Sequence, residues 1–204
     1  MSFHSSVKVW MATAFCAALV LAALVIMRLG PGERGTDVAL QLTARWSFLL
    51  FWPAYSGGAL ATLFGLDQLK RRARDFGLAF ASAHLVHIGL VAWLCRIGAA
   101  PPIGSFVFFG IALIWTYLLA LLSIDRLRQA LGRRFWWLLN IVGLNYIALA
   151  FASDFLGFPV QGDAKYLIGY MPFVALSIAG PALRGAAFVK RTHRSWRSAA
   201  SSVG

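Results

Sequence analysis

The stretch Arg74–Cys95, RDFGLAFASAHLVHIGLVAWLC, contains an apolar run of membrane-spanning length with His84 and His87 near its middle. A hydrocarbon core of about 30 Å needs about 20 apolar residues in a helix. Ionisable side chains are costly inside a bilayer, so they usually face protein or a cofactor. The two histidines are three positions apart, which puts them on roughly one face of a helix. The stretch therefore predicts a membrane helix with an imidazole pair facing the interior of a bundle.

The composition of the whole chain agrees with a membrane protein. Of its 204 residues, 60% are hydrophobic and only 13% are charged. A soluble domain of this size could not cover so much apolar surface with so few charges. The two cysteines, Cys16 and Cys95, lie in separate apolar segments and form no CxxC pair. This pattern predicts neither a disulfide framework nor a thiolate metal site.

Six apolar segments outline the fold, which we predict to be all-α, an integral membrane six-helix bundle formed by residues 1–189. The predicted spans are 9–28, 43–66, 76–95, 103–123, 135–155 and 165–187. The first is interpreted as a retained helix, with a signal anchor as the alternative. Residues 30–37 are predicted to form a polar loop, and residues 190–204 a basic, disordered tail.

Several residues within the spans suggest local features. Trp46 and Trp52 near the start of the second span suit the headgroup region, where aromatic side chains gather. Pro53 in the second span and Pro172 and Pro181 in the sixth predict kinks, which neighbouring helices can accommodate.

The basic residues are distributed unevenly between the two ends of the spans. With six spans, fourteen Lys and Arg fall on the side of both termini and five on the other. The five are Arg28, Arg34, Arg45, Arg96 and Lys165. Basic loops stay on the cytoplasmic side, so both termini are predicted to be cytoplasmic. The net charge of +12 is thus a topology signal and no indication of nucleic acid binding. The basic loops are expected to meet the lipid bilayer at anionic headgroups.

Three motifs occur in a recognisable order: TARW (Thr43–Trp46), RDFGLAF leading to His87, and LGRRFW (Leu131–Trp136). In this order and spacing the chain resembles the ferric reductase-like transmembrane family over about Thr43–Asp154. That family includes the haem-binding membrane subunit of the bacterial methionine sulfoxide reductase system. The resemblance implies a multi-pass protein of a bacterial-type inner membrane.

The same resemblance implies a site for haem b. In the family, histidines from two helices hold the haem from its two faces, and His87 takes the place of the third-span ligand to the haem iron. The fifth-span ligand positions fall on Asn140 and Ser153, and neither is a histidine. Arg45 and Arg96 would be available to pair with haem propionates, although snorkelling to the membrane surface is the ordinary role for both.

Geometry limits what the histidines can do. Because His84 and His87 share one helix face, they cannot ligate opposite faces of one porphyrin. A five-coordinate haem held by His87, a histidine from a second chain, or a lost haem site all remain open. Both histidines could instead be structural, bonding backbone carbonyls or Ser82. Asn140 and Asn145 could be hydrogen-bond partners between helices. Asp154 is expected near the outer surface beside Lys165.

Three functions are therefore left open. The first is a haem b electron-transfer subunit, which would be part of an oxidoreductase. It would need a separate redox partner, because no Walker loop or strand-linked dinucleotide fingerprint indicates a nucleotide or flavin site in this chain. The second is a haem-free derivative that acts as a membrane scaffold or partner protein. The third is a small-molecule transporter, and its only support is the predicted kinks in the second and sixth spans.

Overall fold

Long apolar runs become helices here because backbone groups inside a bilayer can be satisfied within a helix. The computed structural model describes the backbone of residues 3–161 and 164–201, and the side chains of residues 7–157 and 169–193. Every regular element in these residues is an α-helix. They are α1 (Phe3–Leu29), α2 (Glu33–Phe64), α3 (Asp67–Arg96), α4 (Ile103–Leu122), α5 (Asp125–Leu131), α6 (Arg133–Gln161) and α7 (Ala164–Ser201).

Six of these helices, all except the short α5, are long and apolar enough to cross a membrane. The spans are Val7–Leu29, Glu33–Phe64, Asp67–Arg96, Ile103–Leu122, Arg133–Gly157 and Gly169–His193. The predicted all-α membrane bundle is thereby confirmed, and the chain is a multi-pass membrane protein.

Several helices extend beyond the predicted spans, most of all α2, α3 and α7. Helix α2 begins at Glu33, so the predicted polar loop over residues 30–37 is reduced to Gly30–Gly32. An acidic residue in the first turn suits the positive end of the helix dipole, and Thr36 Oγ1 donates to the Gly32 carbonyl at 2.9 Å. Helix α7 continues to Ser201, through most of the predicted disordered tail. No glycine or proline interrupts residues 186–201. Residues 202–204 of that tail lie outside the described part.

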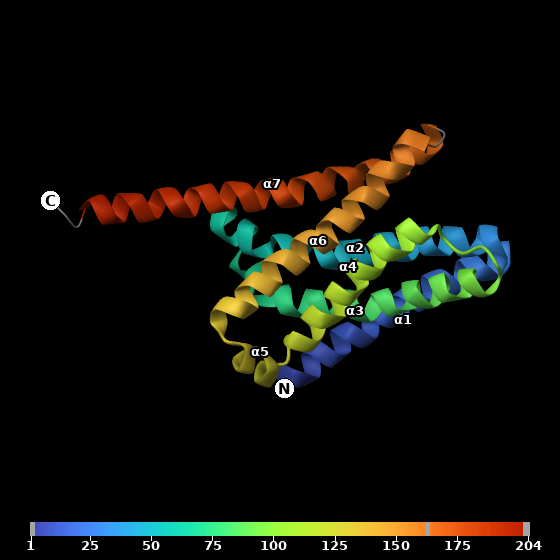
Figure 1. Ribbon diagram of the computed structural model, residues 1–204, viewed down its shortest axis with the longest axis horizontal. Coiled ribbons are helices and arrows are strands. Elements are labelled where there is room, and N and C mark those ends of the chain that lie inside the picture. Colours follow the sequence, from blue (N-terminus) through green and yellow to red (C-terminus); the bar gives the residue numbers. More distant parts are fainter. Residues whose placement is uncertain (1–2, 162–163, 202–204) are drawn as a thin grey trace.

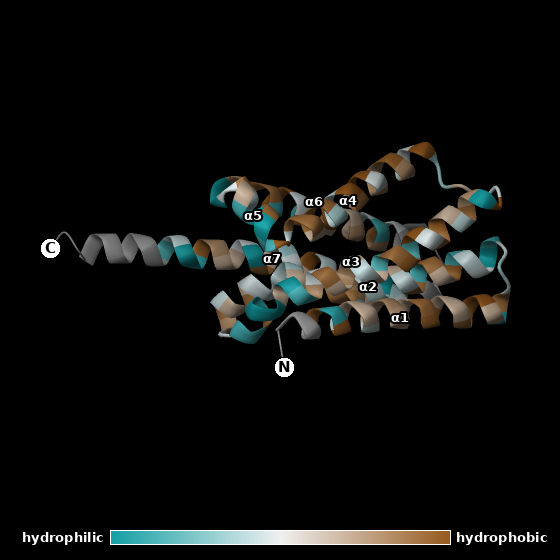
Figure 2. Cartoon of the chain, turned by 90° about the horizontal axis from the view of Figure 1, so that it is seen from below, coloured by the Kyte–Doolittle hydropathy of each residue, from teal (hydrophilic) through white to brown (hydrophobic). Residues whose placement is uncertain are grey.

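The helices form two groups. Helices α1, α2 and α3 pack against one another along their length, while α4 packs with α6 (Figure 1). Helix α7 packs on both α2 and α6 and so joins the two groups. Colouring by hydropathy shows apolar residues along the sides of the helices and polar residues mostly towards their ends (Figure 2). This is the distribution expected of helices that cross a bilayer.

Helix α1 packs through small side chains. Ala14, Ala18 and Ala22 are four residues apart and are 3%, 0% and 6% exposed. Small residues let helix backbones approach closely, which is a main source of helix association in membranes. Trp46 Nε1 donates to the Ala14 carbonyl at 3.1 Å, which fixes α2 to α1. The sequence predicts that Trp46 anchors in the headgroup region. In the structure its indole instead bonds to α1 inside the bundle.

A phenylalanine cluster fills the centre of the bundle between α2, α3, α6 and α7. Its members are Phe48, Phe51, Phe80, Phe151, Phe155 and Phe173. Phe48 lies 4.9 Å from Phe155 and 5.2 Å from Phe151 between ring centroids. Phe51 lies 5.3 Å from Phe80 and 5.5 Å from Phe151. Edge-on and offset ring pairs at such distances are favourable beyond the area that they bury.

The turn between α1 and α2 has the sequence GPGERG over residues 30–35, with the glycine spacing GxGxxG. It follows a membrane helix and not a strand, so the context of a dinucleotide-binding fingerprint is absent. Gly30 has a φ of +83°, a conformation that favours glycine at the end of α1.

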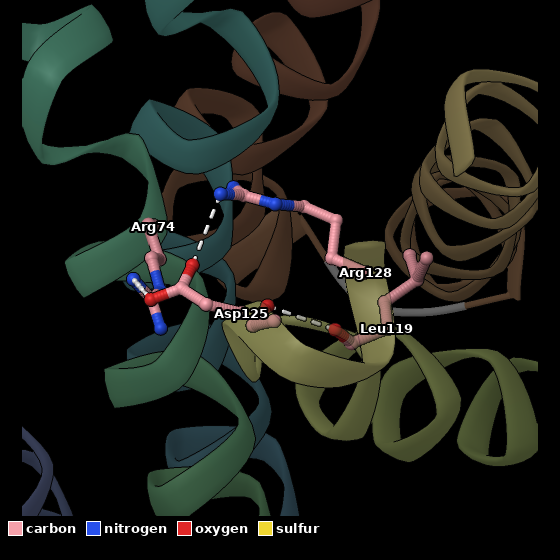
Figure 3. Close-up of polar contacts among 5 residues, drawn as sticks. Arg74, Leu119, Asp125 and Arg128 are labelled. Carbon is pink, nitrogen blue, oxygen red and sulfur yellow. Dashed lines mark hydrogen bonds and ion pairs between the residues drawn. The ribbon is translucent and has the colours of Figure 1, made fainter. Parts of the chain in front are cut away.

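One salt bridge joins α5 to α3, and a second lies within α5 itself. The Asp125 carboxylate lies 3.6 Å from Arg74 Nη1 on α3 and 3.0 Å from Arg128 Nη2 (Figure 3). Next to this junction, Ser123 Oγ donates to the Leu119 carbonyl at 2.8 Å. All three charged side chains are exposed, so each pair stabilises the fold by less than about 1 kcal/mol.

Candidate functional site

The histidine pair lies on α3, facing α2 and α6. The rings of His84 and His87 stack with centroids 4.9 Å apart and planes 13° from parallel, so the predicted common face is confirmed. Both side chains are half-buried within the chain itself. The two imidazoles therefore act as one unit at the interface between helices.

Thr43 of α2 orients His87. The Thr43 hydroxyl oxygen lies 3.2 Å from His87 Nδ1, 2.9 Å from the Ala39 carbonyl and 3.1 Å from the Leu40 carbonyl. Because two helix carbonyls lie within reach of the single hydroxyl proton, we assign the Thr43 oxygen as the acceptor of an N–H at His87 Nδ1. This tautomer leaves His87 Nε2 with a free lone pair. Thr43 begins the TARW motif, but nothing in the sequence indicates that it faces His87.

We expect Thr43→Val to lower the free energy of unfolding by about 0.6–2 kcal/mol, because it removes a hydrogen bond between α2 and the His87 imidazole. Thermal unfolding of the detergent-solubilised protein measures this loss. Nitrogen NMR of the imidazoles should report Nδ1 protonation in the wild type and a mixture of tautomers in the variant.

The matched control for that experiment is Thr116→Val. Thr116 is also buried, but its hydroxyl donates only to the Ala112 carbonyl of its own helix, at 2.9 Å. Loss of such a bond within a helix should be close to neutral. Equal losses from the two variants would contradict the role given to Thr43.

His84 has an apolar environment. Its ring centroid lies 5.4 Å from that of Phe80 and 6.4 Å from that of Phe151 on α6. Its Nδ1 is buried and bonds to none of the described residues. Ser82 was a predicted partner, but its hydroxyl donates instead to the Met11 carbonyl at 3.0 Å.

The predicted fifth-span positions do not come near the histidines. The α6 side chain beside His84 is Phe151, and Ser153 lies about 200° further around the helix. Ser153 is accordingly exposed on the outside of the bundle. Asn140 lies on the same helix face as Phe151, but eleven residues earlier, about 16 Å along the axis. Asn145 Oδ1 accepts a hydrogen bond from the Tyr55 hydroxyl at 2.7 Å, so its predicted role between helices is confirmed.

Arg45 lies inside the bundle, between α2 and α7, and not at the predicted outer surface. Its guanidinium carbon is 4.1 Å from the centroid of the Tyr170 ring and 5.7 Å from that of Phe173. Thr43 and Arg45 are two positions apart and therefore point to opposite sides of α2. Arg45 thus faces away from His87. Its charge is close enough to interact with Asp154 of α6, for which the sequence predicts stabilisation by water or Lys165. The side chain of Lys165 lies outside the described residues.

The geometry can be tested against a haem held from both faces. Each imidazole ligand lies about 2 Å from the iron, so a second ligand atom must face His87 about 4 Å from its nitrogen. Among the described residues the other histidines are His84, which stacks beside His87 on the same helix, and His193, which is exposed on α7. Neither can lie opposite His87, so the described residues do not fit a haem clamped by two histidines of this chain.

Other arrangements of ligands are also absent from the described residues. They contain no group of three or more His, Cys, Asp or Glu side chains placed to hold a metal ion. One surface hollow is lined by Phe188, Val189, Thr192 and His193 of α7, and another by Leu24, Val25, Arg28 and Leu29 of α1. Neither hollow includes the histidine pair.

No protein-family model, curated protein or solved structure matches this chain. The ferric reductase-like assignment thus rests on the three sequence motifs around Thr43, His87 and Leu131, and it stays a prediction.

Proposed function

We propose that this chain is a haem-free derivative of the ferric reductase-like membrane proteins, acting as a scaffold for another membrane protein. The observation that carries this proposal is the aromatic packing beside His84. Phe151 of α6 lies there, with its ring 6.4 Å from His84 and 5.5 Å from Phe51. Packed aromatic rings are a structural filling between helices and offer no iron ligand.

In this proposal the histidines stabilise the bundle. His87 and Thr43 form a hydrogen bond between α3 and α2, and His84 stacks on His87 and contacts the tilted ring of Phe80. A hydrogen bond between membrane helices contributes about 0.6–2 kcal/mol, which is sufficient reason to place an imidazole there.

A second candidate is an electron-transfer subunit with haem b held by His87 alone or together with a histidine of another chain. The Thr43 hydrogen bond favours it, since metal-ligating histidines usually donate their other ring N–H to a neighbouring group. A bound haem would supply one-electron chemistry, and a separate redox partner would have to deliver the electrons.

An absorption spectrum separates the two candidates. The protein is expressed with ample haem, purified in detergent, and measured before and after reduction with dithionite. We expect a helical protein by circular dichroism without a Soret band. A Soret band that shifts on reduction and disappears in His87→Ala would overturn the haem-free proposal. His193→Ala, which changes an exposed histidine of α7, is the control for non-specific haem binding.

A further inference from the structure

The turn joining α2 and α3 extends beyond the membrane end of α1. Trp10 of α1 packs on Phe76 of α3, with ring centroids 5.3 Å apart. Tryptophan side chains gather at the membrane–water boundary. Lys8, two residues before Trp10, lies on the outer side of this boundary. Helix α3 begins at Asp67, nine residues before Phe76, and therefore extends about 13 Å past this level.

Three basic residues on this extension lie at the depth of the lipid headgroups. Lys70, Arg71 and Arg72 precede Phe76 by four to six residues, which places them about 6–9 Å beyond the Trp10 level. The headgroup layer adds about 5–8 Å to each side of the hydrocarbon core. The three side chains are exposed. They therefore reach the layer in which phospholipid phosphates lie.

These three charges form no ion pair with a described carboxylate, although Asp67 and Asp75 lie on the same helix. Both ion pairs among the described side chains end on Asp125, one from Arg74 and one from Arg128 (Figure 3). No described carboxylate pairs with Lys70, Arg71 or Arg72. A run of unpaired cations costs self-repulsion, which an anionic partner would relieve.

Helix α7 adds further positive charge beside this turn. Lys190 Nζ donates to the Thr62 carbonyl at 3.0 Å and lies 3.4 Å from the Leu63 carbonyl, at the last turn of α2. Arg191 follows it and is exposed. The end of α2 and the basic part of α7 are thus held together next to the start of α3.

We propose that Lys70, Arg71 and Arg72 bind the phosphate headgroups of anionic phospholipids in the adjoining leaflet. The occupant is a lipid because the three side chains lie at headgroup depth on a chain that crosses the bilayer. Attraction to an anionic leaflet contributes roughly a fivefold gain in binding for each such charge. This inference does not depend on whether the chain binds haem.

The test is a lipid-retention measurement on the full chain. The protein is reconstituted in nanodiscs of phosphatidylcholine with a minor share of phosphatidylglycerol, and the lipids that remain bound after mild extraction are counted by native mass spectrometry. The wild type should retain phosphatidylglycerol in large excess over its share. Lys70→Gln/Arg71→Gln/Arg72→Gln should reduce this excess at least tenfold, and Arg71→Gln alone about fivefold.

The matched control removes the same charge from the other end of the bundle. Arg28→Gln/Arg34→Gln/Arg96→Gln changes three exposed residues there and should leave the excess within twofold of the wild type. An equal loss from both triple variants, or no excess in the wild type, would overturn the proposal. Full displacement of the lipid by millimolar inorganic phosphate would overturn it too, because the site would then bind a free anion.

Discussion

Gly35→Ala is expected to lower the free energy of unfolding by about 3 kcal/mol, the largest effect of an added methyl group among the described glycines. A Cβ at position 35 would overlap the backbone carbonyl of Gly30 and approach Leu29 Cβ to 3.3 Å. Backbone atoms cannot rotate away as a side chain can, so the whole turn between α1 and α2 must shift. Thermal unfolding in detergent, followed by circular dichroism, measures the loss.

Gly58→Ala on the same helix is the control. A Cβ at Gly58 would meet nothing within 4 Å. Because alanine favours a helix over glycine by about 0.5–1 kcal/mol, this variant should be neutral or slightly more stable. A similar fall in melting temperature for Gly35→Ala and Gly58→Ala would show that the close approach at Gly30 is not the cause.

The second large effect is expected for Phe48→Ala, at about 3–5 kcal/mol of unfolding free energy. Phe48 is 2% exposed and its ring packs on four others, those of Phe51, Phe151, Phe155 and Phe173. Its removal leaves a cavity where α2, α6 and α7 meet, and rigid rings close such a cavity poorly. Unfolding by SDS titration in mixed micelles gives the change in free energy directly.

Leu49→Ala provides the comparison, since Leu49 is the next residue of α2 and is 45% exposed on the lipid-facing side. Lipid chains can fill the space that it leaves, so its loss should be below about 1 kcal/mol. If Phe48→Ala were as mild as Leu49→Ala, the phenylalanine cluster would not be a source of stability, and the packing argument for a haem-free protein would weaken with it.

The sequence predicts the membrane helices well because their signal is local. An apolar run such as the one around His84 has to become a helix in a bilayer, whatever its neighbours are. Helix ends are harder. Glu33 and Asp37 are polar and follow a proline and glycines, which favours a loop. Yet they extend α2, because the first turn of a helix accommodates acidic groups and Thr36 can bond to Gly32.

The site was predictable only in part, because it depends on pairs of residues from different helices. The common face of His84 and His87 follows from their spacing. That Thr43 orients His87, or that Arg45 faces Tyr170, depends on the rotation of α2 against α3 and α7. The family pattern assigns Ser153 to a ligand position only by counting residues along the chain. The helix turns that residue outward and directs Phe151 to His84.

The short turn at Gly30–Gly32 also limits how far α1 and α2 can move against each other. Three residues reach at most about 10 Å, little more than the 8–10 Å that separates the axes of two packed helices. The first two helices therefore form a hairpin without slack. Helix α1 cannot slide along α2 or separate from it unless the turn itself changes conformation.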